Sequence, residues 1–209
     1  MCPRKDDEAE LVRRAVAGDE KALEALYRRY VGAVYRFMYY RTGDRVVAED
    51  LTADVFAAVL KAIPRYEERG LPFGAWLFRI ARAQWVDYRR KEERRKRVSL
   101  KEEVHSEPPL HPSQDEILSH LYFASLLSHL TDEQREVVLL RFIGGLSHAE
   151  IAEVVGSNPN AVKAKLYRAL QRLRATLRVE RQAEEGHEGA GDQGGGDRES
   201  TSRVGTRDR

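Results

Sequence analysis

Residues 131–178 read TDEQREVVLLRFIGGLSHAEIAEVVGSNPNAVKAKLYRALQRLRATLR, and small polar residues divide this stretch into three helical segments. Thr131 stands three residues before Gln134, and Ser147 stands three residues before Glu150. Both pairs have the spacing of a capping box, in which two side chains satisfy the free backbone groups at the start of a helix. The spacing therefore predicts that two helices begin immediately after residues 131 and 147.

A sharp turn separates the second predicted helix from a third. Gly156 suits the left-handed conformation that commonly ends a helix. Asn158 is a favourable N-cap, and Pro159 fits the first helical position because the N–H that it lacks is not needed there. Two helices joined by a short turn that contains glycine are typical of a helix-turn-helix. Apolar residues at helical spacing predict the buried face of the third helix: Val162, Leu166, Ala169, Leu170, Leu173 and Leu177.

The third helix is basic. No acid lies between Gly156 and Arg178, although the whole chain has 36 basic and 34 acidic residues. A recognition helix reads base edges from its first turns, inside the major groove. Candidate DNA-binding residues for an upstream site are therefore Asn158, Asn160, Lys163, Lys165, Tyr167 and Arg168, whereas Arg172, Arg174 and Arg178 lie farther along. A charge run can also be a solvated helix face, but the agreement of caps, turn, proline and charge favours DNA.

Composition limits the remaining possibilities. The chain has 209 residues, of which 42% are hydrophobic and 33% charged, which favours small helical bundles. A net charge of +2 excludes a globally basic coat, so any DNA contact must come from patches. Cys2 is the only cysteine, which excludes a disulfide framework and a Cys-based zinc site and fits a reducing cytosol. No apolar stretch approaches the roughly 18 residues that span a bilayer, so we expect a cytoplasmic protein without membrane insertion.

The N-terminal half shows the helical period four times. The expected helices are 7–17, 20–41, 44–63 and 73–95, separated by Gly18, by Thr42-Gly43 and by the segment PRYEERGLP at 64–72. Glu49, Asp50 and Asp54 cluster near the start of the third helix. Acids are favourable at a helix N-terminus, so this cluster has a local explanation, and a docking face is the alternative.

The helix expected at 73–95 ends in a second positive patch, made of Arg89, Arg90, Lys91, Arg94, Arg95, Lys96 and Arg97. Such a run is often a solvated helix end that complements the helix dipole. Trp85, Asp87 and Tyr88 stand beside it and supply stacking and hydrogen-bonding groups. Their presence favours contact with nucleic acid.

The chain divides into four parts. Residues 98–112, VSLKEEVHSEPPLHP, contain three prolines and no apolar period, and we predict a flexible linker there. Ser113 and Glu116 have capping-box spacing and open a further helix that runs to about Leu127. Residues 180–209 are almost devoid of large apolar side chains and are expected to be disordered. The prediction is an all-α protein with two small helical domains, 8–97 and 113–179, the second a helix-turn-helix.

Three runs in this order carry a resemblance to a known family: AEDLTADVFAAVLKAIPRY at 48–66, GLPFGAWLFRIARAQWVDYRR at 70–90, and the helix-turn-helix stretch. Across about residues 8–178 the chain resembles the two DNA-binding domains of a bacterial RNA polymerase sigma factor of the extracytoplasmic-function (ECF) branch. The resemblance implies a protein that binds core RNA polymerase and directs promoter recognition, DNA melting and transcription initiation. A free-standing helix-turn-helix repressor or activator is the alternative.

The resemblance also implies roles for particular residues. It places Asp50, Leu51, Asp54 and Phe56 against the clamp helices of the polymerase beta-prime subunit. Leu51 and Phe56 are of a type that more often belongs to a core, so we expect Asp50 and Asp54 to carry the docking. The loop at 64–73 would capture an extruded base of the melted non-template strand. The downstream element would be held by Tyr66, Asp87, Tyr88, Arg90 and Lys91, and the last helix would read the upstream element in double-stranded DNA.

Partners beyond the clamp helices are the polymerase beta subunit and promoter DNA, and an anti-sigma factor is left open. Ala83 stands where relatives commonly have Asn, so a base contact made there in relatives is absent here. The six histidines show no ligand spacing, and no nucleophile is set against a base. The sequence therefore predicts recognition rather than catalysis, with no cofactor and no metal.

Overall fold

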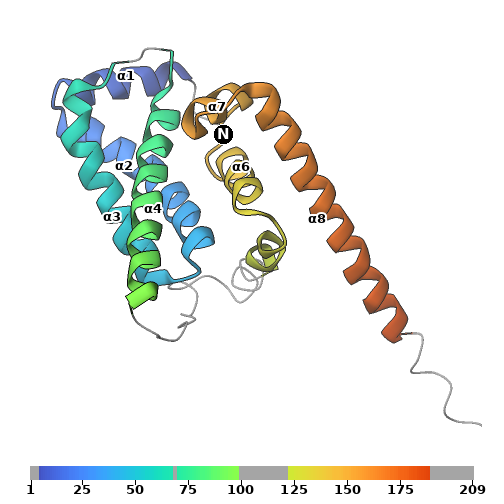
Figure 1. Ribbon diagram of the computed structural model, residues 1–209. Helices are drawn as coiled ribbons and strands as arrows, with labels where there is room; N and C mark the ends of the chain where they lie inside the picture. Colours follow the sequence, from blue (N-terminus) through green and yellow to red (C-terminus); the bar gives the residue numbers. More distant parts are fainter. Residues whose placement is uncertain (1–4, 68–69, 99–121, 189–209) are drawn as a thin grey trace, which may run out of the picture. The chain divides into compact units, whose positions relative to one another are not determined.

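The computed structural model describes residues 5–67, 70–98 and 122–188, and in these residues it contains helices and no strand (Figure 1). The helices are α1 Lys5–Val16, α2 Glu20–Thr42, α3 Arg45–Ala62, the short 3-10 helix η1 Ile63–Arg65, α4 Phe73–Val98, α6 Asp132–Phe142, α7 His148–Val155 and α8 Pro159–Glu188. Residues 122–128 are also helical. The all-α prediction is confirmed, whereas the linker at 98–112 and the Ser113–Glu116 capping box lie outside the described residues, apart from Val98.

Short polar caps position the helices of the first half. The Asp19 carboxylate accepts hydrogen bonds from the backbone N–H groups of Lys21 (2.9 Å) and Ala22 (3.2 Å) at the start of α2. Asp44 accepts from the Val47 N–H (3.1 Å) at the start of α3. Gly43, at the end of α2, has a φ of 68°, a left-handed conformation that glycine adopts without strain. Gly43 and the Asp44 cap fix the turn between α2 and α3, and with it the position of the acidic cluster.

Helices α2, α3 and α4 bury one apolar core between them. Phe37 and Met38 of α2, Val55 of α3, and Leu77 and Phe78 of α4 are completely or almost completely buried. The Phe37 and Phe78 rings meet edge to face with centroids 5.6 Å apart. Burial of each large side chain contributes about 1.5–3 kcal/mol to the stability of the folded state. The three helices therefore form a rigid support for the residues on their outer faces.

The helices of the helix-turn-helix begin and end where the capping residues predict. Both capping boxes are present, Thr131 with Gln134 and Ser147 with Glu150. Gly156 ends α7 with a φ of 69°. The Asn158 Oδ1 accepts a hydrogen bond from the Ala161 N–H (2.8 Å), so α8 begins at a fixed place.

Helix α6 is covered on opposite sides. Val137, Val138, Leu139 and Leu140 are all buried, and four consecutive residues point around most of the helix circumference because each is turned by about 100° from the last. Residues of α6 and α7 belong to the same apolar cluster as those of α2 and α4, and α7 packs against α4. The helix-turn-helix therefore shares a core with the first half.

Helix α8 extends farther than the sequence predicts. The expected end was Val179, but the helix continues to Glu188. Residues 180–185 are Glu, Arg, Gln, Ala, Glu and Glu, which have high helix propensity, and the first glycine after them is Gly186. Residues up to Leu173 form one compact unit and residues from Arg174 form another. Leu177, predicted to be buried, belongs to the second unit and is 39% exposed.

Candidate nucleic-acid interface

One face of α8 presents a stripe of exposed residues. Asn160, Lys163, Ala164, Tyr167 and Arg168 are all exposed, and their spacing places them on neighbouring turns of the same face. Val162, Leu166 and Ala169 are buried on the other side of α8 and hold it to the domain. Tyr167 is 63% exposed, so its ring and hydroxyl are accessible to a partner. We call these five exposed residues the α8 stripe.

Two of the predicted upstream contacts lie elsewhere. Asn158 is exposed, but its side-chain oxygen serves as the helix N-cap. Lys165 is half-buried, and its Nζ forms an ion pair with the Glu133 carboxylate of α6 at 2.7 Å. The hydrogen bond from Lys165 lowers the pKa of Glu133 below its ordinary value. The structure thus gives Lys165 a partner within the protein and separates it from the α8 stripe.

Of the predicted downstream contacts, some are exposed and others are partly or fully buried. Asp87, Arg90 and Lys91 are exposed and lie within one turn of each other on α4. Tyr88 is half-buried, and burial, followed by the nearby Glu92 charge, raises the pKa of its hydroxyl. The first three residues therefore form an accessible set.

Tyr66 does not join that set. Its side chain is buried, its hydroxyl donates a hydrogen bond to the Leu71 carbonyl (3.0 Å), and its ring packs against Phe73 and Trp76. Tyr66, which is predicted from the sequence to contact DNA, instead holds the two ends of the loop before α4 together. The sequence could not show this, because an aromatic residue in a loop fits either role.

The predicted docking residues lie on α3. Asp50 and Asp54 are exposed one turn apart, whereas Leu51 is buried and Phe56 half-buried. The Phe56 ring meets the Tyr27 ring of α2 edge to face, with centroids 4.8 Å apart. Two hollows flank this ring pair between α2 and α3, with volumes of about 230 and 400 Å³. The acid of α3 that lines these hollows is Glu49, whereas Asp50 and Asp54 are exposed elsewhere on the helix.

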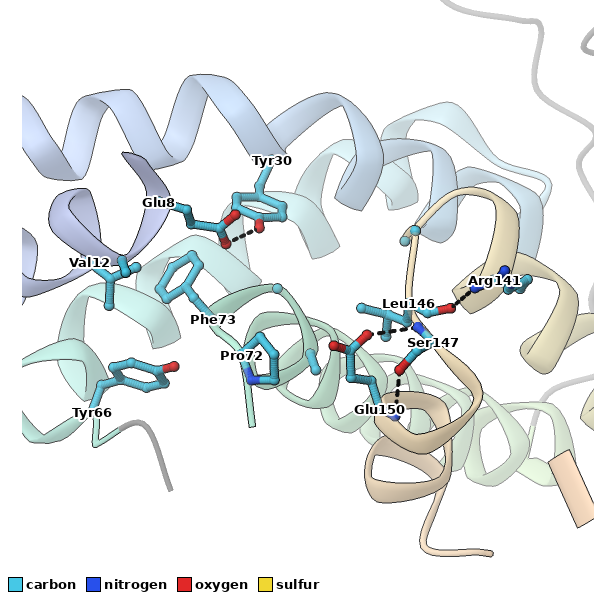
Figure 2. A pocket seen from close by; sticks show the side chains of 15 residues that line it. Glu8, Val12, Tyr30, Tyr66, Pro72, Phe73, Arg141, Leu146, Ser147 and Glu150 are labelled. Atoms are coloured by element: carbon cyan, nitrogen blue, oxygen red, sulfur yellow. Dashed lines mark hydrogen bonds between the residues drawn. The ribbon is translucent and has the colours of Figure 1, made fainter. Parts of the chain in front are cut away.

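A third cavity, of about 420 Å³, lies where α1, α2 and the start of α4 meet the turn before α7 (Figure 2). The Tyr30 hydroxyl donates to Glu8 Oε1 at 2.5 Å, and Arg29 pairs with the same carboxylate. Burial and the Glu8 hydrogen bond raise the pKa of Tyr30. On the opposite wall Arg141 donates to the Leu146 carbonyl at 2.8 Å. These polar groups are engaged with one another, so they indicate no ligand.

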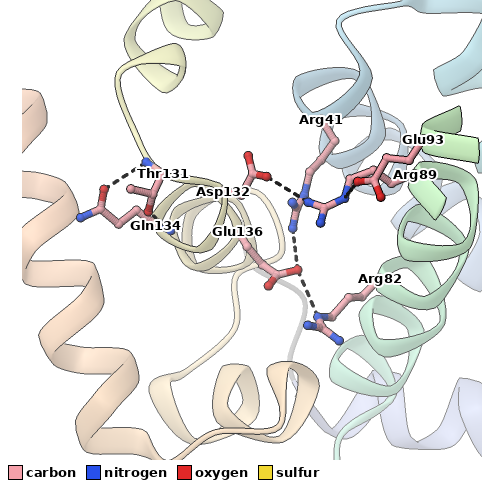
Figure 3. A network of polar contacts seen from close by, with 8 residues as sticks. All are labelled: Arg41, Arg82, Arg89, Glu93, Thr131, Asp132, Gln134 and Glu136. Atoms are coloured by element: carbon pink, nitrogen blue, oxygen red, sulfur yellow. Dashed lines mark hydrogen bonds and ion pairs between the residues drawn. The ribbon is translucent and has the colours of Figure 1, made fainter. Parts of the chain in front are cut away.

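Sequence analysis missed a cluster of ionic contacts between α6 and the first half (Figure 3). Arg41 Nη2 lies 2.5 Å from Glu136 Oε1, and Arg82 Nε lies 3.1 Å from the same oxygen. Arg89 Nη1 lies 2.9 Å from Asp132 Oδ2. The Arg41 guanidinium also stacks over the rings of Phe37 (5.3 Å) and Trp85 (5.4 Å). No spacing in the sequence connects residues 41, 82 and 136, so only the fold reveals this cluster.

The described residues contain neither a candidate metal site nor a candidate membrane-spanning helix. No group of three or more histidine, cysteine, aspartate and glutamate side chains is arranged to hold a metal ion in that part of the chain. Among its helices, none is both long enough and apolar enough to cross a membrane.

Comparison with known families matches the two halves separately. Residues 26–95 match the family Sigma-70 region 2, and residues 120–173 match the family Sigma-70, region 4. The first match contains α3, α4 and most of α2, and the second contains the helix-turn-helix with the start of α8. The α8 stripe and the exposed candidates Asp50, Asp54, Asp87, Arg90 and Lys91 thus fall within matched regions.

Curated relatives cover most of the chain. The ECF RNA polymerase sigma factor BldN of Streptomyces coelicolor is 40% identical over 171 residues, which are 80% of this chain and 65% of BldN. The ECF RNA polymerase sigma factor ShbA of Streptomyces griseus is 36% identical over 186 residues, with 82% of this chain and 97% of ShbA covered. The chain therefore spans almost all of ShbA and slightly less than two thirds of BldN.

Solved structures agree with these relatives. CnrH in complex with the cytosolic domain of CnrY matches with a TM-score of 0.64 and 26% identity, covering 82% of this chain and 97% of that one. The sigma factor RpoE in complex with the anti-sigma factor NepR, from Bartonella quintana, matches with a TM-score of 0.66 and 27% identity, covering 76% and 98%. The chain therefore belongs to the ECF RNA polymerase sigma factors, with a sigma-70 region 2 followed by a sigma-70 region 4.

Proposed function

We propose that this chain acts as a sigma factor through three surfaces: the α8 stripe, the exposed end of α4 and the acidic edge of α3. Sigma factors of this family direct promoter recognition and transcription initiation, and this chain is one of them. The single observation that carries the assignment of surfaces is the α8 stripe. An exposed, acid-free helix face that starts at a fixed cap is what a recognition helix requires.

The α8 stripe has the groups that read base edges. Arg168 and Lys163 can donate to guanine, and Asn160 can pair with adenine through its amide. Val162 and Leu166 keep the opposite face buried, so the stripe can enter the groove without exposing the core. We assign the upstream promoter element to these residues.

We assign the downstream promoter element to exposed residues of α4. Arg90 and Lys91 are exposed cations, and Asp87 beside them can accept a hydrogen bond from a base amino group. Tyr66 serves by shaping the adjoining loop, because its ring is buried. This assignment keeps three of the five residues that the sequence proposed as direct contacts and makes Tyr66 a positioning residue.

Polymerase docking falls to α3. Asp50 and Asp54 supply charge, and the groove beside Tyr27 and Phe56 supplies apolar surface. Protein interfaces commonly combine apolar surface with polar residues, and Glu49 is the acid of α3 that lines the groove itself. RpoE of Bartonella quintana was crystallised with an anti-sigma factor, and we include a protein partner of that kind in the proposal. The chain would act in the cytoplasm as a regulatory protein rather than an enzyme.

Run-off transcription with purified core RNA polymerase tests the proposal. The wild type should give a transcript from at least one upstream region of its source genome, and the doubly substituted Asp50→Asn/Asp54→Asn protein should give much less while melting at the wild-type temperature. Glu153→Gln, which removes an exposed acid of α7, is the matched control and should transcribe normally. Tight binding of the protein alone to a palindrome, with no transcript from any region tested, would instead identify a free-standing regulator.

A further inference from the structure

We propose that Glu136 is an internal latch: it closes region 4 onto the arginines of region 2, and promoter DNA competes with it for the same arginines. The inference rests on the proposed function, because it assumes that α4 contacts DNA. The carboxylate of Glu136 lies between two arginines of different helices, Arg41 of α2 and Arg82 of α4 (Figure 3). Asp132 adds a second acid one turn away, against Arg89 of α4.

The latch lies on the same helix as the proposed DNA contacts. Arg89 directly precedes Arg90 and Lys91, and in the closed chain it is held by Asp132 and by Glu93 of its own helix. Arg82 stands two turns earlier and is held by Glu136. A backbone phosphate, like a carboxylate, presents anionic oxygens to which the planar guanidinium of arginine can donate two hydrogen bonds. The acids of α6 therefore occupy cationic groups that a phosphate backbone would otherwise attract.

Burial makes Glu136 the centre of the latch. The Arg41 side chain is 4% exposed and that of Glu136 is 12% exposed, whereas the Arg89 and Asp132 side chains are 49% and 64% exposed. Exposed ion pairs contribute little, but removing one partner of a buried pair leaves the other charge uncompensated. Loss of the Glu136 charge should thus open the interface more effectively than loss of any exposed charge.

The rest of the interface consists of apolar contacts. Gly144 of the turn before α7 approaches the Phe78 ring of α4 so closely that an added Cβ would lie 3.2 Å from its Cε2. The Phe123 ring meets the Tyr40 ring of α2 with centroids 4.9 Å apart. These apolar contacts fix the register of the halves, and the ionic cluster supplies the group that DNA can replace. Interfaces between domains of one chain are commonly reversible.

The test uses the full-length protein with Cys2 replaced by serine and dyes on cysteines introduced at the exposed positions Lys61 and Glu153, so that energy transfer reports closure. Glu136→Gln keeps the shape of the side chain and removes its charge. We expect lower energy transfer and a roughly 5- to 150-fold gain in affinity for a promoter duplex whose downstream element has an unpaired non-template strand, the usual range for coupled sites. Glu24→Gln, which breaks the Glu24–Arg28 pair within α2, is the matched control and should change neither quantity.

A second variant keeps the inference testable if Glu136→Gln destabilises the helix-turn-helix. Arg82→Met leaves α6 intact and should also lower energy transfer, without the gain in DNA affinity because a phosphate contact is lost. Wild-type energy transfer in both variants would overturn the latch. Lower energy transfer in Glu136→Gln with unchanged DNA affinity would also overturn the latch, even if the wild type transcribes normally with core polymerase. Failure of the wild type to transcribe with core polymerase would overturn the proposed function instead.

Discussion

Arg168 and Lys165 are three residues apart on α8, but the structure gives them different surroundings. Arg168 belongs to the exposed stripe, whereas Lys165 is half-buried and paired with Glu133. We predict that Arg168→Ala in the holoenzyme costs about 1–3 kcal/mol on the preferred upstream element and reduces discrimination among variants of it. Lys165→Ala should leave the order of preference unchanged. Binding to a small panel of upstream sequences at several salt concentrations measures both effects.

Arg174→Ala provides the comparison for this panel. It lies farther along α8, so it should weaken binding to all sequences alike and reduce the salt slope by about one phosphate contact. A uniform loss in Arg168→Ala, with the sequence preference retained, would show that Arg168 holds phosphate and that discrimination comes from Asn160, Tyr167 or DNA shape. Altered preference in Lys165→Ala would restore that residue to the reading surface.

Asp19 allows a prediction of pH dependence. The hydrogen bond from Arg14, followed by that from the Ala22 N–H, lowers the pKa of its carboxyl below the ordinary 3.8. The folded state therefore favours the charged form, and the stabilisation is complete above the ordinary pKa and lost as pH falls through the lowered value. Asp19→Ala should lower Tm by roughly 2–4 °C above about pH 5, as expected for a lost N-cap.

The pH profile separates the cap from its charge. The Tm difference between wild type and Asp19→Ala should shrink as the pH falls below the ordinary pKa of 3.8, because the Asp19 carboxyl then binds a proton more readily in the unfolded chain than in the folded one. Asp19→Asn keeps a hydrogen-bond acceptor and should retain part of the stability at every pH. A Tm difference that persists unchanged into strong acid would mean that packing around residue 19, rather than the carboxylate, sets the stability.

At the scale of helices, local signals predicted starts better than they predicted ends and faces. The caps at Thr131, Ser147 and Asn158 are short-range hydrogen bonds between neighbours in sequence, so the residues alone identify them. The end of α8 has no such signal, since residues 180–185 favour a helix whether or not it packs on anything. The run Val137–Leu140 is apolar, but the sequence does not show which surfaces cover it.

Helix α8 gives a prediction at this scale. Its buried residues, Val162, Leu166 and Ala169, lie before Leu173, and the residues from Arg174 form a separate unit. Deletion of residues 180–209 should therefore leave the cooperative melting transition of the protein within a few degrees of the wild type. Truncation before Leu166 removes two of the three buried anchors and should abolish folding of the helix-turn-helix. A large Tm loss in the shorter deletion would show that the last turns of α8 or the tail contribute to the core.

For the whole molecule, the outer surfaces were predictable and the contacts between halves were not. The Asp50–Asp54 edge and the exposed end of α4 could be found because each lies on one helix with a recognisable period. The pairing of Glu136 with Arg41 depends on tertiary packing that brings together residues 95 positions apart. The sequence suggests DNA contacts for Tyr66 and Trp85. An aromatic residue type alone, however, does not distinguish stacking on a base from packing against a neighbouring ring or a buried guanidinium.

The distance along the chain between the halves sets how readily the latch closes. Residues 99–121 join α4 to the helical segment that begins at Tyr122, and the sequence predicts that much of this stretch is a linker. Insertion of a Gly/Ser segment as long as the linker predicted at 98–112 doubles that linker, and the concentration of one half around the other falls as about the 3/2 power of length. The closure constant should therefore fall about threefold, with the contacts of the latch unchanged.

This prediction is measured with the same two dyes, at the salt concentration where half of the wild-type molecules are open. The closed fraction of the lengthened chain should fall to about one quarter, since a threefold lower constant changes the ratio from one to one third. Glu136→Gln should lower the closure constant by the same factor in both chains, because linker length and latch contacts act independently. An unchanged closed fraction would mean that residues 99–121 do not act as a free tether. A loss much greater than threefold would mean that they make contacts of their own in the closed chain.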